Sequence, residues 1–216
     1  MTDRTNASDG TQSIDGTQSI DSTQTIDGAQ SIDSTQTMDG TELVSLQRTL
    51  TERYPIGLAT IGNSLRADDD IASRVCDALP AAALKYVCRY DLGTYTSFLG
   101  ECLRKHKAAI VIDATENGTA AGATTIVNIE ALLKGDNSIK ISSSHGFSFL
   151  DELRLYHRST ALPNPFYFFG VEAKSIDWSE NLSPELEAQI PQLAQSLESL
   201  IESVLETLNE KCMKRA

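Results

Sequence analysis

The stretch "AAIVIDA" at residues 108–114 is the clearest buried strand in the chain, and it ends beside an aspartate. A continuous apolar run without polar alternation is typical of a strand covered on both faces, as in a parallel sheet. Four more segments have strand composition, and they lie on both sides of this run in the sequence. These segments span residues 56–62, 85–91, 123–129 and 165–173.

Helical segments separate the predicted strands. In residues 70–79, Ile71, Val75 and Leu79 recur at i, i+4 and i+8, which places them on one helical face. Further helices are predicted at residues 45–54, 95–106 and 147–158. Strands that alternate with helices predict a three-layer α/β fold with a mostly parallel sheet.

The C-terminal segment has clear helix signals. Ser183 is a suitable N-cap, Pro184 suits the first helical position, and Pro191 should kink or restart the helix. Beyond Pro191 the leucines and isoleucines form one apolar stripe. We expect this stripe to pack on the core, with a seam for a partner as the alternative.

Residues 1–42 differ in composition from the rest. From Asp9 the chain repeats in sixes, beginning DGTQSI, and this segment holds eight acidic residues against one arginine. One apolar residue in six buries too little surface to offset chain entropy, so we expect a disordered acidic tail. A short β-solenoid-like stack or a docking arm is the alternative. Residues 43–216 are then a single α/β domain.

The overall charge excludes some partners. The formal net charge is −12, which argues against nonspecific nucleic-acid binding and against anionic membrane surfaces. Apolar runs are too short for a membrane span, and the N-terminus has no signal-peptide pattern. The four scattered cysteines suit reduced thiols. These features predict a cytoplasmic protein, which we expect to be a monomer.

Polar residues follow several predicted strands at the edge where parallel sheets bind ligands. Asp68, Asp69 and Asp70 follow the first strand, and Asp113 ends the third. His145 stands in a "SSSHG" segment before a helix. Two carboxylates and one imidazole suit a divalent transition metal with open positions, and a carboxylate pair could alternatively perform acid/base catalysis.

Other residues have simpler interpretations. Asp68 or Asp70 could cap the following helix, because aspartate is a preferred N-cap. His106 and His157 lie late on amphipathic helices and are expected to be solvated. The chain lacks G-x-S-x-G, and "GNSLRA" matches neither a dinucleotide fingerprint nor a Walker loop.

Taken together, these motifs resemble the hydrogenase maturation proteases, from about residue 56 to about residue 197. The family's opening motif matches "ATIGNSLRADD", and its later motifs occur in the same order. The remaining matches are Asp91-Leu92-Gly93-Thr94, Asp113-Ala114, Ala121-Gly122, Ser143-Ser144-His145-Gly146, Gly170-Val171-Glu172 and Leu182-Ser183-Pro184.

The resemblance implies an aspartyl-type peptidase with a twisted five-stranded sheet between helices. Its catalytic, metal-contacting residues fall on Asp69, Asp113 and His145. The metal is nickel supplied by the substrate, a nickel-iron hydrogenase large-subunit precursor that loses its C-terminal extension after nickel insertion. No stably held cofactor is implied, and Asp91 could support the site or hold its turn.

Some positions depart from the family pattern. Asp70 and Ala72 stand where the family usually has glycine, and Ala121 replaces a proline. A non-catalytic protein that binds or escorts the large subunit is therefore an alternative. A peptidyl-tRNA hydrolase would need a basic surface and an early histidine, whereas this chain is acidic and has no histidine before His106.

Overall fold

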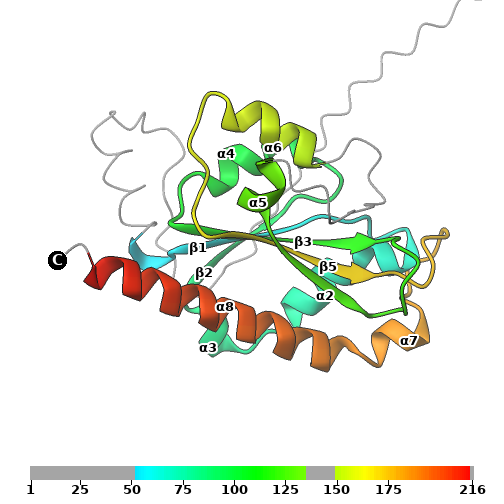
Figure 1. Cartoon of the computed structure of the whole chain (residues 1–216). Coiled ribbons are helices and arrows are strands. Elements are labelled where there is room, and N and C mark those ends of the chain that lie inside the picture. The colour runs from blue at the N-terminus through cyan, green and yellow to red at the C-terminus, as the bar shows by residue number, and fades with distance from the viewer. Residues whose placement is uncertain (1–51, 135–148, 215–216) are drawn as a thin grey trace, which may run out of the picture. The chain divides into compact units, whose positions relative to one another are not determined.

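The computed structural model describes residues 52–134 and 149–214. All of them belong to one unit, Met38–Ala216. The predicted tail at residues 1–42 and the segment containing His145 lie outside the described residues, as does most of the predicted helix at 45–54. Figure 1 shows the arrangement of the described elements.

A five-stranded sheet forms the centre of the domain, in the order β2-β1-β3-β5-β4. β1, β2, β3 and β5 run parallel, and β4 pairs antiparallel with β5 at one edge. Each strand overlaps one of the predicted segments, so the mostly parallel five-stranded sheet is confirmed. The strands are β1 (Ile56–Thr60), β2 (Val87–Asp91), β3 (Ala108–Thr115), β4 (Thr124–Asn128) and β5 (Phe166–Glu172).

Helices cover both faces of the sheet (Figure 1). One layer contains α2 (Ile71–Asp77), α3 (Ala81–Leu84), α7 (Pro184–Glu187) and α8 (Ile190–Met213). The other contains α4 (Leu99–Leu103), α5 (Ile129–Leu133) and α6 (Phe149–His157). Two 3-10 turns, η1 (Ala67–Asp70) and η2 (Thr96–Phe98), lead into α2 and α4. The predicted three-layer architecture is confirmed.

The central strand β3 explains the sequence run that defines the fold. All eight of its residues are buried. Ile110 and Ile112 belong to the core under α2 and α8, whereas Ala109 and Val111 belong to the core under α4 and α6. Because side chains alternate across a strand and both faces are covered, every position favours an apolar residue.

The C-terminal helices follow their predicted signals. The Ser183 hydroxyl accepts a hydrogen bond from Leu186 N at 3.4 Å, and Pro184 begins α7. The chain then restarts as α8, with Pro191 in its first turn, where a missing N–H is tolerated. The apolar stripe packs into the core, as expected, through Leu193, Ala194, Leu197, Leu200, Ile201 and Val204.

The prediction for His106 was wrong, because its side chain is buried rather than solvated. Its ring nitrogens lie 2.8 Å from the Tyr90 hydroxyl and 2.8 Å from the Tyr54 carbonyl oxygen. Gly57 makes room for the ring, since a Cβ atom there would lie 2.6 Å from His106 Cδ2. Burial lowers the pKa of His106, which favours the neutral ring. His157 is exposed, as predicted.

In residues 52–134 and 149–214, no helix is both long and apolar enough to cross a bilayer.

Candidate active site

The carboxyl ends of β1, β3 and β5 meet at one edge of the sheet, because these neighbouring strands are parallel. The loop after β1 carries Asp69, and β3 carries Asp113 near its end. Ile61 N donates to Ile112 O at 2.9 Å. The start of that loop therefore lies beside Ile112, the residue that precedes Asp113 in β3. η1 also contacts β3. The structure therefore brings both predicted carboxylates to the same edge.

Asp69 is positioned by the Gly62-Asn63 pair. The backbone N–H of Asn63 donates to Asp69 Oδ2 at 3.0 Å. Gly62 has a φ of +155°, and a Cβ atom there would collide with the carbonyl oxygen of Asp69. Asp69 is completely buried. The glycine is therefore required for the close approach of backbone that brings Asp69 to the edge.

Asp113 lies within the most protected part of the sheet. It is completely buried and pairs in register with Gly170 of β5. The strand continues two residues beyond Asp113, to Thr115, so this carboxylate belongs to the sheet itself rather than to a loop. A side chain on a central strand is held more rigidly than one on a loop, which suits a group that must keep a fixed geometry.

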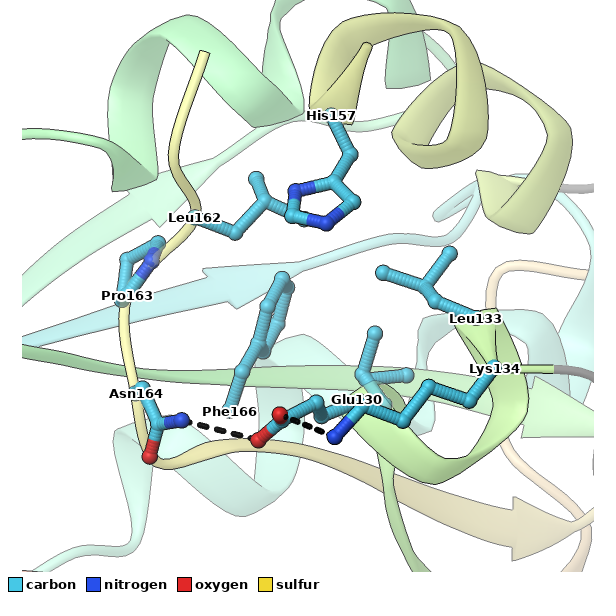
Figure 2. Close-up of a pocket in the computed structure, with 9 residues that line it drawn as sticks. Glu130, Leu133, Lys134, His157, Leu162, Pro163, Asn164 and Phe166 are labelled. Atoms are coloured by element: carbon cyan, nitrogen blue, oxygen red, sulfur yellow. Dashed lines mark hydrogen bonds and ion pairs between the residues drawn. The ribbon is translucent and has the colours of Figure 1, made fainter.

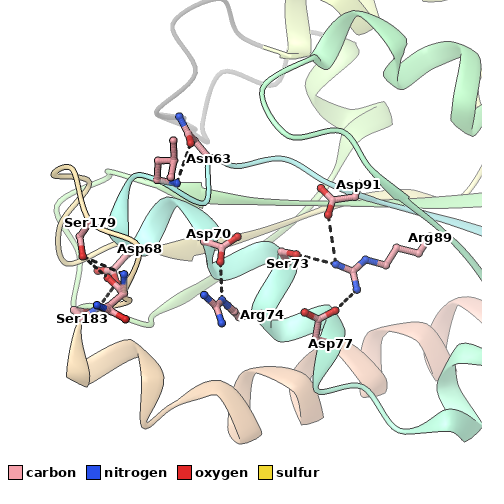
Figure 3. Close-up of polar contacts among 12 residues, drawn as sticks. Asn63, Asp68, Asp70, Ser73, Arg74, Asp77, Arg89, Asp91, Ser179 and Ser183 are labelled. Carbon is pink, nitrogen blue, oxygen red and sulfur yellow. Dashed lines mark hydrogen bonds and ion pairs between the residues drawn. The ribbon is translucent and has the colours of Figure 1, made fainter. Parts of the chain in front are cut away.

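Asp68 does not cap the helix that follows it. Its Oδ2 accepts hydrogen bonds from Lys174 N at 2.9 Å and Ser175 N at 3.0 Å, and its Oδ1 accepts one from Ser183 N at 2.6 Å. Figure 3 shows Asp68 beside Ser183, which lies far from it in the sequence. The buried carboxylate of Asp68 thus joins the loop after β1 to the loop after β5 through three hydrogen bonds.

Asp70 also makes no side-chain capping bond to the described residues, although it occupies the N-cap position of α2. Its carboxylate instead pairs with Arg74 Nε at 2.6 Å, one turn along the helix (Figure 3). The prediction that Asp68 or Asp70 serves as the cap was therefore wrong. Both carboxylates have stronger partners, an arginine for Asp70 and three backbone amides for Asp68. Ala72, the other departure from the family pattern, is buried in the core without a polar group to satisfy.

Glu172 organises the loop that follows β3. Its side chain accepts hydrogen bonds from Thr115 Oγ1 at 3.0 Å, Asn117 N at 3.0 Å, Gly118 N at 2.6 Å and Thr119 N at 3.0 Å. Burial raises the pKa of the Glu172 carboxyl, but these hydrogen bonds outweigh burial and the net pKa is lowered. Glu172 is therefore an ionised anchor for the loop beside Asp113.

The side chain of Asp91 stabilises the turn that follows β2. Its Oδ1 accepts from Thr60 Oγ1 at 3.3 Å and from Gly93 N at 3.4 Å, while Oδ2 lies 3.7 Å from Arg89. Its side chain is 60% exposed. These contacts support the turn-holding interpretation of Asp91.

His145, the third predicted site residue, lies outside the described residues. Within the described ranges, no three histidine, cysteine or acidic side chains are grouped to hold a metal ion. The predicted set of three therefore depends on the position of His145.

A separate pocket of about 170 Å³ lies at the opposite, amino end of β5. Its apolar wall includes Leu133, Leu162 and Phe166. At its rim, Glu130 pairs with Lys134 at 2.6 Å and accepts from Asn164 Nδ2 at 2.8 Å (Figure 2). Neither Asp69 nor Asp113 lines this pocket, and three of its polar groups, Glu130, Lys134 and Asn164, are paired with one another. The pocket is therefore not the predicted site.

The role of Asp68, whose carboxylate joins the loops after β1 and β5, was not predicted from the sequence. The available signal was the joint presence of the "DD" pair and the Leu182-Ser183-Pro184 motif. The structure explains their joint presence, because Ser183 N donates to Asp68.

The comparisons with known proteins place this architecture in a class of endopeptidases. The chain is similar to an Escherichia coli endopeptidase solved in solution, with 29% identity over 68% of this chain and 93% of that one, and a TM-score of 0.53. It is also similar to the hydrogenase maturating endopeptidase HybD from E. coli, with 26% identity, 72% and 93% coverage and a TM-score of 0.52. HybD from Thermococcus kodakarensis, at 21% identity, 68% and 98% coverage and a TM-score of 0.51, shares the fold.

The family model for hydrogenase maturation protease matches residues 74–200, which is more than half of the chain. This protein therefore belongs to the hydrogenase maturation protease family. The matched range contains Asp113 and His145 and begins after Asp69. No curated protein sequence matches the chain.

Proposed function

We propose that this peptidase removes the C-terminal extension of a nickel-iron hydrogenase large-subunit precursor after nickel insertion. Membership of the hydrogenase maturation protease family supports the reaction class. The observation that carries the proposal is the placement of two completely buried carboxylates, Asp69 and Asp113, at the carboxyl edge of adjacent strands β1 and β3.

In this proposal, Asp69, Asp113 and His145 engage the nickel carried by the substrate. At Asp69, the N–H of Asn63 donates to one carboxylate oxygen and helps to hold the side chain at the sheet edge. A divalent cation presented by the substrate attracts carboxylates, so we expect the two acids to favour a nickel-loaded precursor over a nickel-free one.

The metal contact would position the neighbouring peptide bond, and most of the rate gain would come from that placement. Water then adds to the scissile carbonyl carbon, the C–N bond breaks, and the leaving amine takes a proton. The carbonyl is polarised by nickel, or the water is activated by nickel or by a carboxylate. The protein contributes Asp69, Asp113 and His145, and activation of the water by one of the two carboxylates would make the enzyme an aspartyl-type peptidase.

In this proposal the enzyme holds no metal of its own and acts as a monomer in the cytoplasm. Its four cysteines, all within the described residues, are free thiols, which fits a reducing compartment. We expect purified protein to require no added metal when the precursor already carries nickel.

The test is to incubate the full-length protein with nickel-loaded and nickel-free precursor and to measure the precursor's mass over time. We expect trimming of the nickel-loaded form only. Equal trimming of both forms would contradict the nickel check, and trimming of neither form would contradict the endopeptidase assignment.

A further inference from the structure

We infer that Leu65, Tyr95 and Trp178 form a docking surface for the folded part of the large-subunit precursor. This inference rests on the proposed function, because it names the surface that would deliver the scissile bond to Asp69 and Asp113. The three residues are called the docking surface below.

The docking surface consists of large apolar side chains that contribute little to the protein's own core. Trp178 is 78% exposed, Tyr95 is 71% exposed and Leu65 is 49% exposed. Single exposed apolar residues are common on protein surfaces, but several around a functional site mark an interaction surface. Trp178 is also the chain's single tryptophan.

Backbone hydrogen bonds join the loops that carry Leu65 and Trp178. Ser179 N donates to Leu65 O at 3.0 Å, and Ala67 N donates to Ser179 O at 2.7 Å. Arg66 Nε donates to Ile176 O at 3.1 Å. Leu65 and Trp178 therefore lie on two loop segments that are paired through their backbones, and this pair of segments is called the ribbon below. The carboxylate of Asp68 also binds the loop that carries Trp178.

This ribbon lies beside the candidate active site. It connects the loop after β1 with the loop after β5, and β3 lies between these two strands in the sheet. Asp113 is near the carboxyl end of β3, and Asp69 belongs to the same loop as Leu65. A protein that placed a peptide bond at the two aspartates would therefore meet the ribbon.

Tyr95 extends the docking surface on the other side of the β1 loop. It follows the turn at Gly93, whose carbonyl oxygen accepts from Gly62 N at 3.0 Å. Tyr95 N donates to Leu92 O at 2.9 Å, which closes this turn. The backbone hydrogen bonds run from the turn before Tyr95 through Gly62 and on to the loops of Leu65 and Trp178, so all three residues belong to the edge that holds the acids.

The occupant is a folded protein surface rather than a short peptide alone. Tryptophan and tyrosine are enriched among the residues that dominate binding energy at protein interfaces. Loops already fixed by hydrogen bonds lose little conformational entropy on binding. A surface of this kind gains affinity from a partner that presents complementary area on both sides of the scissile bond.

The test compares two double variants of the full-length protein on nickel-loaded precursor. In Leu65→Ser/Trp178→Ala we expect KM to rise about tenfold with kcat nearly unchanged, and the melting temperature to stay close to that of the wild type. The control, Tyr86→Ala/Met213→Ser, changes exposed residues away from this edge. Tyr86 precedes β2, and Met213 ends α8 (Figure 1). We expect the control to keep the wild-type KM.

A second readout does not need cleavage. The single tryptophan can be replaced by 5-fluorotryptophan, which gives one fluorine resonance from position 178. We expect this resonance to shift or broaden when precursor is added to the Asp113→Asn protein.

The outcomes separate the two proposals. If the wild type trims the precursor and Leu65→Ser/Trp178→Ala keeps the same KM, the docking surface is wrong and the proposed function stands. If the wild type trims nothing but the Trp178 resonance responds to precursor, the surface stands and the peptidase assignment falls. If neither trimming nor a response occurs, both fall.

Discussion

The carbonyl oxygen of Asp69 occupies the space that a Cβ atom on Gly62 would need. The next amide, Asn63 N, donates to the carboxylate of the same aspartate at 3.0 Å. One glycine and its neighbour thus fix both the backbone and the side chain of a proposed site residue. A change at Gly62 should therefore affect stability and activity together.

We expect Gly62→Ala to lower the free energy of unfolding by about 2–4 kcal/mol, because it combines a steric collision with an unfavourable φ. Displacement of Asp69 should also reduce precursor trimming about a hundredfold. The matched control is Gly118→Ala, where φ is also positive but nothing lies within 4 Å of the added atom. Urea unfolding should show a loss of only about 1 kcal/mol there. Equal losses at both positions would contradict the steric argument.

Asp69→Asn and Asp113→Asn preserve side-chain shape and remove the negative charge. We expect each to reduce the initial rate of precursor trimming about a hundredfold or more, because each removes a proposed nickel contact and a candidate base. The control is Asp70→Asn, which loses only the ion pair with Arg74 and should trim at nearly the wild-type rate. Normal trimming by Asp113→Asn would overturn the site assignment.

Asp68→Asn should act on stability more than on chemistry. The substitution weakens three charge-assisted hydrogen bonds and places a side-chain NH2 group against backbone N–H donors. We therefore expect the free energy of unfolding to fall by about 2–4 kcal/mol. Asp177→Asn changes an exposed acid in the loop that Asp68 holds, and it should cost less than about 0.5 kcal/mol. Denaturant unfolding at pH 7 measures both. A loss for Asp68→Asn no larger than that of its control would show that the loop does not depend on this carboxylate.

The lowered pKa of Glu172 predicts acid sensitivity. A carboxyl with a lower pKa in the folded state stabilises the fold at pH values above its unfolded pKa, about 4.3 for glutamate. That stabilisation is lost as the pH falls through the folded-state pKa.

We therefore expect Glu172→Gln to be less stable than the wild type at pH 7 by about 2–4 kcal/mol. The difference should narrow as the pH falls below about 4.3, because the wild type then loses its carboxylate. Urea unfolding across this range gives the comparison, with exposed Glu180→Gln as the control. A gap that stays constant with pH would mean that the ionised carboxyl is not the stabilising species.

The strands could be predicted because a strand that is buried on both faces has apolar residues at consecutive positions. The run at 108–114 is apolar throughout, since Ile110 and Ile112 face one core and Ala109 and Val111 face the other. The antiparallel direction of β4 was not predictable in this way. Strand direction depends on the path of the connecting chain, and the same side chains would suit either direction.

The candidate site was predicted in part. Asp69 and Asp113 reach the same edge because parallel neighbouring strands end together. The roles of Asp68 and Asp70 depend on Ser183 and Arg74, and the Ser183 contact is distant in sequence, so local capping rules favoured the wrong partner. His106 was missed for a similar reason, because the space for its ring comes from Gly57 on a neighbouring element.

The position of Asp113 on β3 has a consequence for how the enzyme moves. Amide hydrogens of a fully buried central strand exchange with solvent mainly when the whole domain opens, whereas amides in surface loops exchange through small local openings. We therefore expect the amides around Asp113 to be among the slowest to exchange. Asp69 lies on a loop, but its backbone packs against Gly62 and its carboxylate accepts from Asn63 N. Both acids should thus hold their positions before a substrate arrives, one through the sheet and the other through a single tightly packed turn.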